Sequence, residues 1–224
     1  GDSLKNGDFV EIQYIGKIKE TGKIFDVTDE TKAKQANVYN EGNKYEPIQV
    51  VVGAGHVIKG LDESLLDIEV GETKTFDIIP EKGFGKRDSS LLQIMHLNDF
   101  KKHGIFPRTG LKIEINGHWA TVRSVSSGRV KLDFNHPLSG KTLLYEVTLL
   151  KKIEDLTEKI NAIIKIRAPG IDVSSQVVNF EGEKVNIELK GINPPYKSSL
   201  EEFIKSDISS YISEIKDTSI IFID

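Results

Sequence analysis

The sequence predicts an α+β protein built from short antiparallel strands and a few helices, and three observations support this. In the first 85 residues, apolar and polar residues alternate in short runs around one short helix pattern. An Asn-Gly turn signal stands at residues 116–117, between two alternating runs. Residues 153–224 carry helix and strand patterns in the order α-β-β-α-β. A chain of 224 residues is long enough for two or three small domains.

The first 85 residues divide into strands, a polar excursion and a helix. Residues 9–14, 48–52 and 73–79 are rich in alternating or continuous apolar residues and predict strands. Residues 28–46 are polar and predict an exposed excursion that carries a helical turn. In residues 60–71, apolar side chains recur at helical spacing between two glycines, which predicts a short helix.

The middle of the chain predicts a small β-meander. Residues 112–115 and 118–125 flank Asn116-Gly117, and these two residue types tolerate the positive φ angles of a type I′ turn. A further strand is expected at residues 130–134. Residues 143–150 alternate again and predict a strand that returns to the first sheet.

Composition and charge exclude several classes of function. The chain has 30 basic and 34 acidic residues, well mixed, and no basic stripe, which argues against nucleic acid as a partner. No apolar run is long enough to cross a membrane. The absence of cysteine excludes disulfides and thiolate zinc sites, and the five histidines lack metal-ligand spacing. We therefore expect a cytoplasmic protein without metal or other cofactor.

Four motifs resemble those of the FKBP-type peptidyl-prolyl cis-trans isomerases, and they stand in the same order. Residues 22–26 (GKIFD) resemble the family's G-x-x-F-D, and residues 57–65 (VIKGLDESL) resemble its V-I-x-G and the helix that follows. Residues 80–85 (PEKGFG) are similar to the family segment that usually contains A-Y-G. Residues 133–141 (DFNHPLSGK) are similar to the SlyD-like string D-x-N-H-P-L-A-G-K.

This resemblance covers about residues 4–151 and implies an FKBP-like antiparallel half-barrel wrapped on a short helix. It is closest in kind to SlyD-like members, which carry an inserted chaperone domain in the flap, and to the long archaeal type with an added C-terminal domain. The predicted domains are an isomerase domain at residues 1–87 and 133–151, a β-rich insert at 88–132, and a C-terminal α+β domain at 152–224.

The resemblance also assigns an active site. Catalytic roles fall to Tyr14, Asp26 and Phe84, with Phe84 standing where a tyrosine is commoner. The walls and floor of an apolar substrate pocket are assigned to Phe25, Ile48, Val57, Ile58, Leu61 and Tyr145. Taken singly, the apolar residues are explained as plain core, Asp26 as a turn-forming aspartate and Tyr14 as a buried phenol. Only their joint order supports a pocket.

The predicted activity is isomerisation of X-Pro bonds combined with holding of unfolded polypeptide. Rotation about this bond breaks amide resonance, at a barrier of about 18–20 kcal/mol. A pocket without water favours the twisted, less polar transition state. The partners expected are unfolded or partly folded polypeptides that contain X-Pro. Two alternatives remain: a catalytically weak chaperone or assembly module that only binds polypeptide, and a scaffold dominated by the C-terminal domain.

The holding surface is expected on the insert, because a unit of this size cannot bury all its apolar side chains. Its predicted members are Leu92, Ile94, Met95, Phe100, Ile105 and Phe106.

The two predicted helices of the C-terminal domain have wide apolar stripes, which must be buried against another surface. The outer face of the first strand shows Glu11, Gln13, Lys17 and Lys19, which offers no apolar docking surface. We therefore expect a homodimer through residues 153–224.

Overall fold

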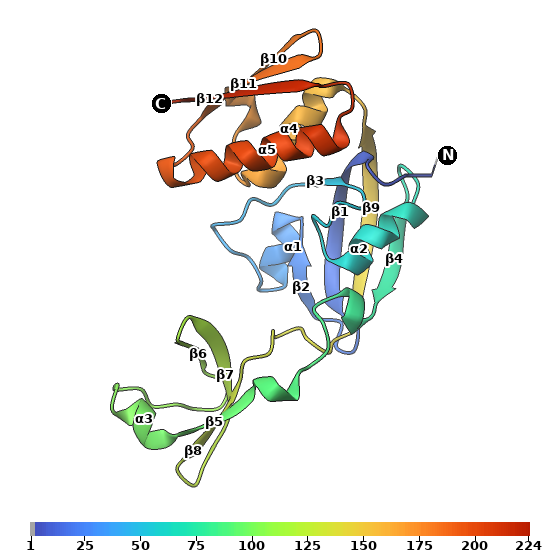
Figure 1. Ribbon diagram of the computed structural model, residues 1–224. Helices are drawn as coiled ribbons and strands as arrows, with labels where there is room; N and C mark the ends of the chain where they lie inside the picture. The colour runs from blue at the N-terminus through green and yellow to red at the C-terminus, as the bar shows by residue number, and fades with distance from the viewer. Residues whose placement is uncertain (1–2) are drawn as a thin grey trace. The chain divides into compact units, whose positions relative to one another are not determined.

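The computed structural model describes residues 3–224 and confirms the α+β class (Figure 1). The chain forms two compact units. The first unit contains the residues up to Ile78 together with Leu143–Asp224, and the second unit is Ile79–Thr142. Within residues 3–224, no helix is long and apolar enough to cross a membrane.

A five-stranded antiparallel sheet organises the first unit. Its strands are β1 (Phe9–Ile18), β2 (Ile24–Val27), β3 (Ile48–Val51), β4 (Thr73–Ile78) and β9 (Leu143–Ile153). Strand β1 is central, because it pairs along its whole length with β9 and uses its other edge for β3 and then β2. Strand β4 pairs with the far edge of β9, so the returning strand predicted at residues 143–150 does rejoin the first sheet.

The predicted short helix is α2 (Lys59–Ser64), which continues as a 3-10 turn and contacts β4. Its apolar face is fully buried through Leu61 and Leu65. The Asp62 carboxylate accepts hydrogen bonds from the N–H groups of Gly53 and Gly55, at 2.8 and 3.0 Å. The helix therefore holds the loop that leads from β3 to the site described below.

The polar excursion at residues 28–46 contains the expected helical turn. Helix α1 (Glu30–Gln35) begins after Asp29, whose side chain accepts a hydrogen bond from the first turn. The loop that follows is ordered by Tyr39 and Tyr45, whose rings stack with centroids 5.3 Å apart.

The C-terminal part of the first unit follows the expected order of elements. These are α4 (Leu156–Arg167), β10 (Val177–Glu181), β11 (Lys184–Lys190), α5 (Lys197–Tyr211) and β12 (Asp217–Ile223). Strand β11 pairs antiparallel with β10 and parallel with β12. The buried side chains of β11 alternate along the strand and pack in one core with the buried faces of α4 and α5.

This part docks on the five-stranded sheet, so the prediction that the sheet offers no apolar docking surface is wrong. Phe9, Val51 and Ile153 are buried in the same core as the apolar faces of α4 and α5. Phe9 and Val10 are neighbours and both are buried, so both faces of β1 are covered at this end. Glu11, Gln13 and Lys17 lie farther along β1, and Lys19 follows its last residue. The homodimer stays a prediction, but its main argument is removed.

A four-stranded antiparallel sheet forms the second unit. In spatial order its strands are β5 (Leu92–His96), β8 (Arg129–Asp133), β7 (His118–Ser126) and β6 (Lys112–Ile115), with α3 (Leu97–Lys101) between β5 and β6 along the chain. Asn116 and Gly117 have φ angles of 51° and 81°, which confirms the predicted tight turn between β6 and β7.

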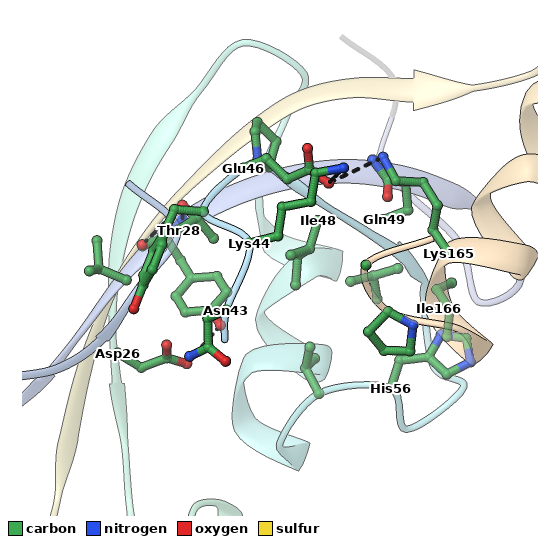
Figure 2. A pocket seen from close by; sticks show the side chains of 18 of the residues that line it. Asp26, Thr28, Asn43, Lys44, Glu46, Ile48, Gln49, His56, Lys165 and Ile166 are labelled. Carbon is green, nitrogen blue, oxygen red and sulfur yellow. Dashed lines mark hydrogen bonds and ion pairs between the residues drawn. The ribbon is translucent and has the colours of Figure 1, made fainter. Parts of the chain in front are cut away.

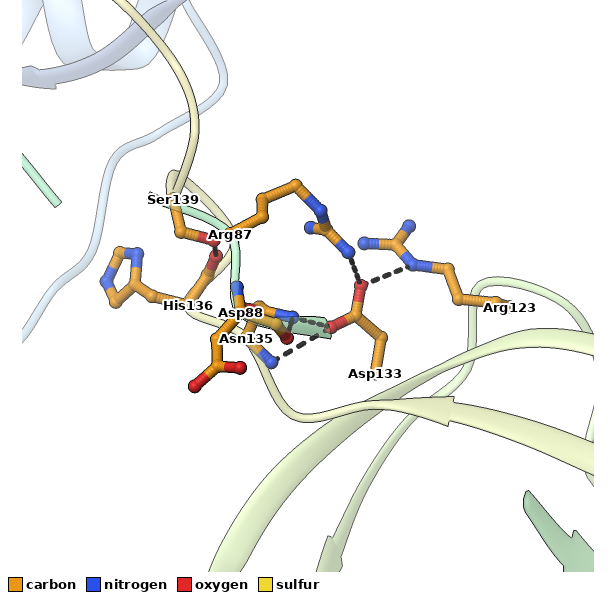
Figure 3. Close-up of polar contacts among 7 residues, drawn as sticks. All are labelled: Arg87, Asp88, Arg123, Asp133, Asn135, His136 and Ser139. Carbon is orange, nitrogen blue, oxygen red and sulfur yellow. Dashed lines mark hydrogen bonds and ion pairs between the residues drawn. The ribbon is translucent and has the colours of Figure 1, made fainter. Parts of the chain in front are cut away.

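A buried carboxylate joins the two ends of the second unit (Figure 3). Asp133, at the end of β8, accepts hydrogen bonds from Arg87 at 2.6 Å, from Arg123 at 2.9 Å and from Asn135. Asn135 also bonds the backbone of Asp88 in both directions. Burial alone would raise the pKa of Asp133, but the hydrogen bonds outweigh burial and hold the pKa well below its usual value.

Replacing Asp133 with asparagine should therefore destabilise the second unit by about 1–2 kcal/mol, the range for a charge-assisted hydrogen bond to groups that are partly solvated. The carboxylate contributes fully above its unfolded pKa of about 3.9, and the contribution is lost as pH falls toward the lower folded value. Thermal unfolding should show a constant difference between wild type and Asp133→Asn from about pH 5 to pH 8, which shrinks below about pH 4. The control Asp217→Asn removes an exposed carboxylate and should change little. A difference that grows at low pH contradicts the assignment.

Candidate functional site

A cavity of about 400 Å³ opens in the first unit beside β1, β2 and β3. Its lining combines the loop of residues 42–47 with side chains from three strands and from the end of α4. Figure 2 shows Asp26 and Thr28 at one end, Ile48 between, and His56 and Ile166 at the other end. The volume lies in the range of ligand pockets, about 300–1,000 Å³.

Tyr14 and Asp26 form a polar pair at the first end. Strand pairing of β1 with β2 places them close together, and the Tyr14 hydroxyl donates to the Asp26 carboxylate at 2.7 Å. Burial and the neighbouring negative charge raise the pKa of Tyr14 well above its usual value. The hydroxyl therefore keeps its proton and holds the exposed carboxylate in one orientation.

An aromatic group lies behind this pair. The ring of Tyr145 is 5.4 Å from that of Tyr14 and meets Phe25 edge to face at 5.8 Å. A Cβ at Gly16 would lie 3.0 Å from the Phe25 ring and 3.1 Å from the Tyr145 ring, so a side chain there would require the rings to shift by a few tenths of an ångström. Burial raises the pKa of Tyr145, which stays a neutral phenol.

The loop before α2 supplies the other wall. Val57 lines the cavity, and Ile58 follows it as the N-cap residue of α2 with an extended backbone. Leu61 is buried one turn farther on. The ring nitrogen Nδ1 of His56 accepts the N–H of Val51 at 3.2 Å, and burial lowers the pKa of His56. This histidine is therefore neutral near pH 7.

The cavity brings together four of the predicted site residues: Tyr14, Asp26, Ile48 and Val57. Phe25, Ile58, Leu61 and Tyr145 are not among its lining residues; Phe25 and Tyr145 lie in the aromatic group, and Ile58 and Leu61 lie at the start of α2 and on it. Their pocket roles stay predictions.

Phe84 belongs to the second unit, where it stacks on His136 with ring centroids 4.6 Å apart and planes 6° apart. His136 in turn accepts the N–H of Leu138 at 3.0 Å and so holds the turn at Pro137. The motif at residues 133–141 thus fixes the orientation of the Phe84 ring within its own unit. Its catalytic role stays a prediction.

Part of the lining has no distinguishing pattern in the sequence. Lys165, Ile166, Pro169 and Gly170 line the far end, although they come from the C-terminal part of the chain. Nothing in their local pattern distinguishes them from the end of any amphipathic helix. Only the docking of α4 on the sheet brings them to the cavity.

The predicted holding surface of the second unit is only partly exposed. Ile94 and Phe106 expose 65% and 77% of their surface, and Ile105 is also exposed. Phe100 is only 4% exposed, so its assignment to the surface is wrong: it fills the small core between α3 and the sheet. Met95 packs against that core and Leu92 is half-buried.

Trp119 on β7, which was not among the predicted members of the holding surface, exposes 65% of its surface. Its neighbours Ala120 and Val122 are buried, so strand alternation places Ala120 and Val122 on one face and Trp119 on the other. That alternation could have identified it.

Residues 3–224 contain no group of three or more His, Asp or Glu side chains that could hold a metal ion.

Several known proteins are similar to this chain in sequence. A short-type peptidyl-prolyl cis-trans isomerase of Methanocaldococcus jannaschii is 39% identical over 144 residues, which are 64% of this chain and 90% of that protein. The FKBP-type isomerase SlyD of Helicobacter pylori is 29% identical over 166 residues, 72% of this chain and 80% of that protein. The family model described as "FKBP26, IF domain" matches residues 93–138, within the second unit.

The first unit thus combines an antiparallel sheet, a short buried helix and a cavity that has the Tyr14–Asp26 pair at one end. Together with the relatives, they identify the family. The chain belongs to the FKBP-type peptidyl-prolyl cis-trans isomerases.

Proposed function

We propose that this protein accelerates the cis/trans isomerisation of X-Pro bonds in polypeptides and that its second unit holds unfolded chains. The observation that carries the catalytic half is the Tyr14–Asp26 hydrogen bond at the end of a cavity with apolar walls. The relatives named as isomerases support the same conclusion.

Catalysis follows from the difference between the planar and the twisted bond. The planar amide is polar and well solvated, whereas the twisted form has lost resonance and much of the charge on its oxygen. Ile48 and Val57 exclude water from one side of the cavity, which penalises the planar form more than the twisted one. No covalent intermediate is needed.

The polar pair orients the bound segment. The Tyr14 hydroxyl is occupied by Asp26, so the carboxylate keeps one fixed direction at the cavity's end. A fixed negative group there attracts the N–H groups and polarised C–H edges of a bound peptide and limits its rotation to the X-Pro bond.

The holding function rests on the exposed apolar side chains of the second unit. Ile94, Phe106 and Trp119 are large and exposed on a unit whose own core is small. Exposed apolar side chains of this size are typical of surfaces that bind other polypeptides. The alternative is a catalytically weak member that only binds polypeptide, which the next experiment separates from the first proposal.

Turnover of the full chain on short X-Pro peptides tests the catalytic proposal. Asp26→Ala should lower kcat/KM by about ten- to a hundredfold, the effect of losing about 1–3 kcal/mol of oriented polar interaction. Asp77→Ala is the matched control, since Asp77 is an exposed aspartate of the same sheet that pairs with Lys19. Equal turnover of Asp26→Ala and Asp77→Ala would rule out the assigned pair. A wild-type chain that binds peptides without turnover favours the alternative.

A further inference from the structure

One end of the cavity is built by the C-terminal part of the chain. Lys165 and Ile166 belong to the last turn of α4, and Pro169 and Gly170 follow directly. Figure 2 shows Ile166 and His56 together at the end opposite Asp26. The Tyr14–Asp26 pair and the C-terminal wall therefore face different parts of one cavity.

This wall is held on two sides. Lys165 forms an ion pair with Glu46 of the cavity rim at 3.6 Å. Arg167 binds the buried carboxylate of Asp207 on α5 through two hydrogen bonds, at 2.6 and 2.8 Å. A bidentate guanidinium–carboxylate pair fixes direction as well as distance, so the end of α4 is rigidly placed against the rim.

The inner surface at this end is largely apolar. Ile48, Val57, Ile166 and Pro169 contribute hydrocarbon surface. His56 lies beside them, and burial is the main cause that lowers its pKa. At the rim, Glu46 is shared by Lys165 and Lys44, each at 3.6 Å.

A proline ring has only three side-chain carbons and fills a small part of about 400 Å³. The remaining space is therefore available to a neighbouring residue of the substrate. We propose that Ile166 and Pro169, together with Ile48 and Val57, form a second subsite that binds an apolar side chain flanking the proline. This inference deepens the proposed function and rests on it: the C-terminal part of the chain then sets substrate preference.

The test measures kcat and KM of the full chain on X-Pro peptides with leucine, alanine or lysine before the proline, and on a second series with the same residues after it. In one of the two series, Ile166→Asp and Pro169→Asp should each lower kcat/KM for the leucine peptide by about tenfold through KM, as expected for losing one apolar contact set. For the lysine peptide, kcat/KM of these variants should be higher than that of wild type. For the alanine peptide, kcat/KM should change least. Ile221→Asp is the matched control, because Ile221 is exposed on β12 away from the cavity.

Pro169 is exposed, so its variant keeps the test valid if thermal unfolding shows that Ile166→Asp has lost its fold. Unchanged preferences in a folded variant, with normal wild-type turnover, overturn the subsite and leave the proposed function standing. A wild-type chain with no turnover on any peptide overturns the proposed function and the subsite together.

Discussion

Replacing residues 88–132 by a short turn is expected to slow the catalysis of proline-limited protein refolding by about a hundredfold, while turnover of tetrapeptides changes little. The replaced segment contains the sheet and the exposed side chains of the second unit. A surface that holds an unfolded chain raises the local concentration of X-Pro bonds for the isomerase site, and such linkage is worth about 10²–10⁴ in apparent affinity. A tetrapeptide is too short to benefit.

The chain ends left by this replacement are well placed for closure. The N–H of Gly140 donates to the carbonyl of Gly85 at 2.7 Å, so the two segments already run side by side before the insert. Phe84 and His136 remain outside the replaced range and keep their stacking contact. The variant therefore removes the insert without removing the motif at its base.

A surface variant separates the role of the exposed side chains from that of the insert as a whole. Ile94→Ser, Phe106→Ser and Trp119→Ser combined should reproduce most of the loss in refolding catalysis, because each side chain is exposed and its replacement leaves the core intact. Rates would be measured on an unfolded protein whose refolding is limited by proline isomerisation. Refolding catalysis that survives both variants excludes the second unit as the holding surface.

Phe9→Ala is expected to lower the free energy of unfolding of the first unit by about 3–5 kcal/mol, the usual cost of removing a buried phenyl ring. Phe9 is 1% exposed and packs in the core shared by the five-stranded sheet and the C-terminal helices. The ammonium of Lys159 on α4 also lies 5.4 Å from its ring centroid. The mutation therefore weakens both the sheet and the docking of α4.

Denaturant unfolding followed by circular dichroism measures this effect, with Phe106→Ala as the matched control. Phe106 is 77% exposed, so its removal should cost little stability. Equal stability of the two variants contradicts a shared core. A second transition that appears only in Phe9→Ala would show that the C-terminal part has become an independent folding unit.

The local elements of the fold could be predicted because each depends on neighbours in sequence. The turn at Asn116 and Gly117 follows from the residues that tolerate positive φ, and the strands follow from alternation. The order α-β-β-α-β of the C-terminal part follows from periodicity in the same way. Helix α5 begins at Lys197, directly after a 3-10 turn over Pro194–Tyr196.

The polar end of the candidate site could be predicted as well. Asp26 sits in one of the motifs whose order along the chain indicates the family, and Tyr14 is assigned through the same resemblance. Strand pairing makes the two residues neighbours. Phe100 was misplaced because an apolar residue in a small unit can either line a surface or fill the core. Its neighbours in space decide between these outcomes, and they come from β7 and β8.

By itself, the sequence determined the family, the α+β elements and the polar pair of the site, since these depend on short motifs and on the periodicity of single strands and helices. Only the tertiary structure decided that the C-terminal part docks on the sheet through Phe9 and Val51, and that Ile166 and Pro169 reach the cavity. Both depend on complementary surfaces from segments far apart in the chain. In the sequence, each of the two contacting segments has the pattern of an ordinary apolar stripe. Its role is decided by the segment against which it packs in the folded protein.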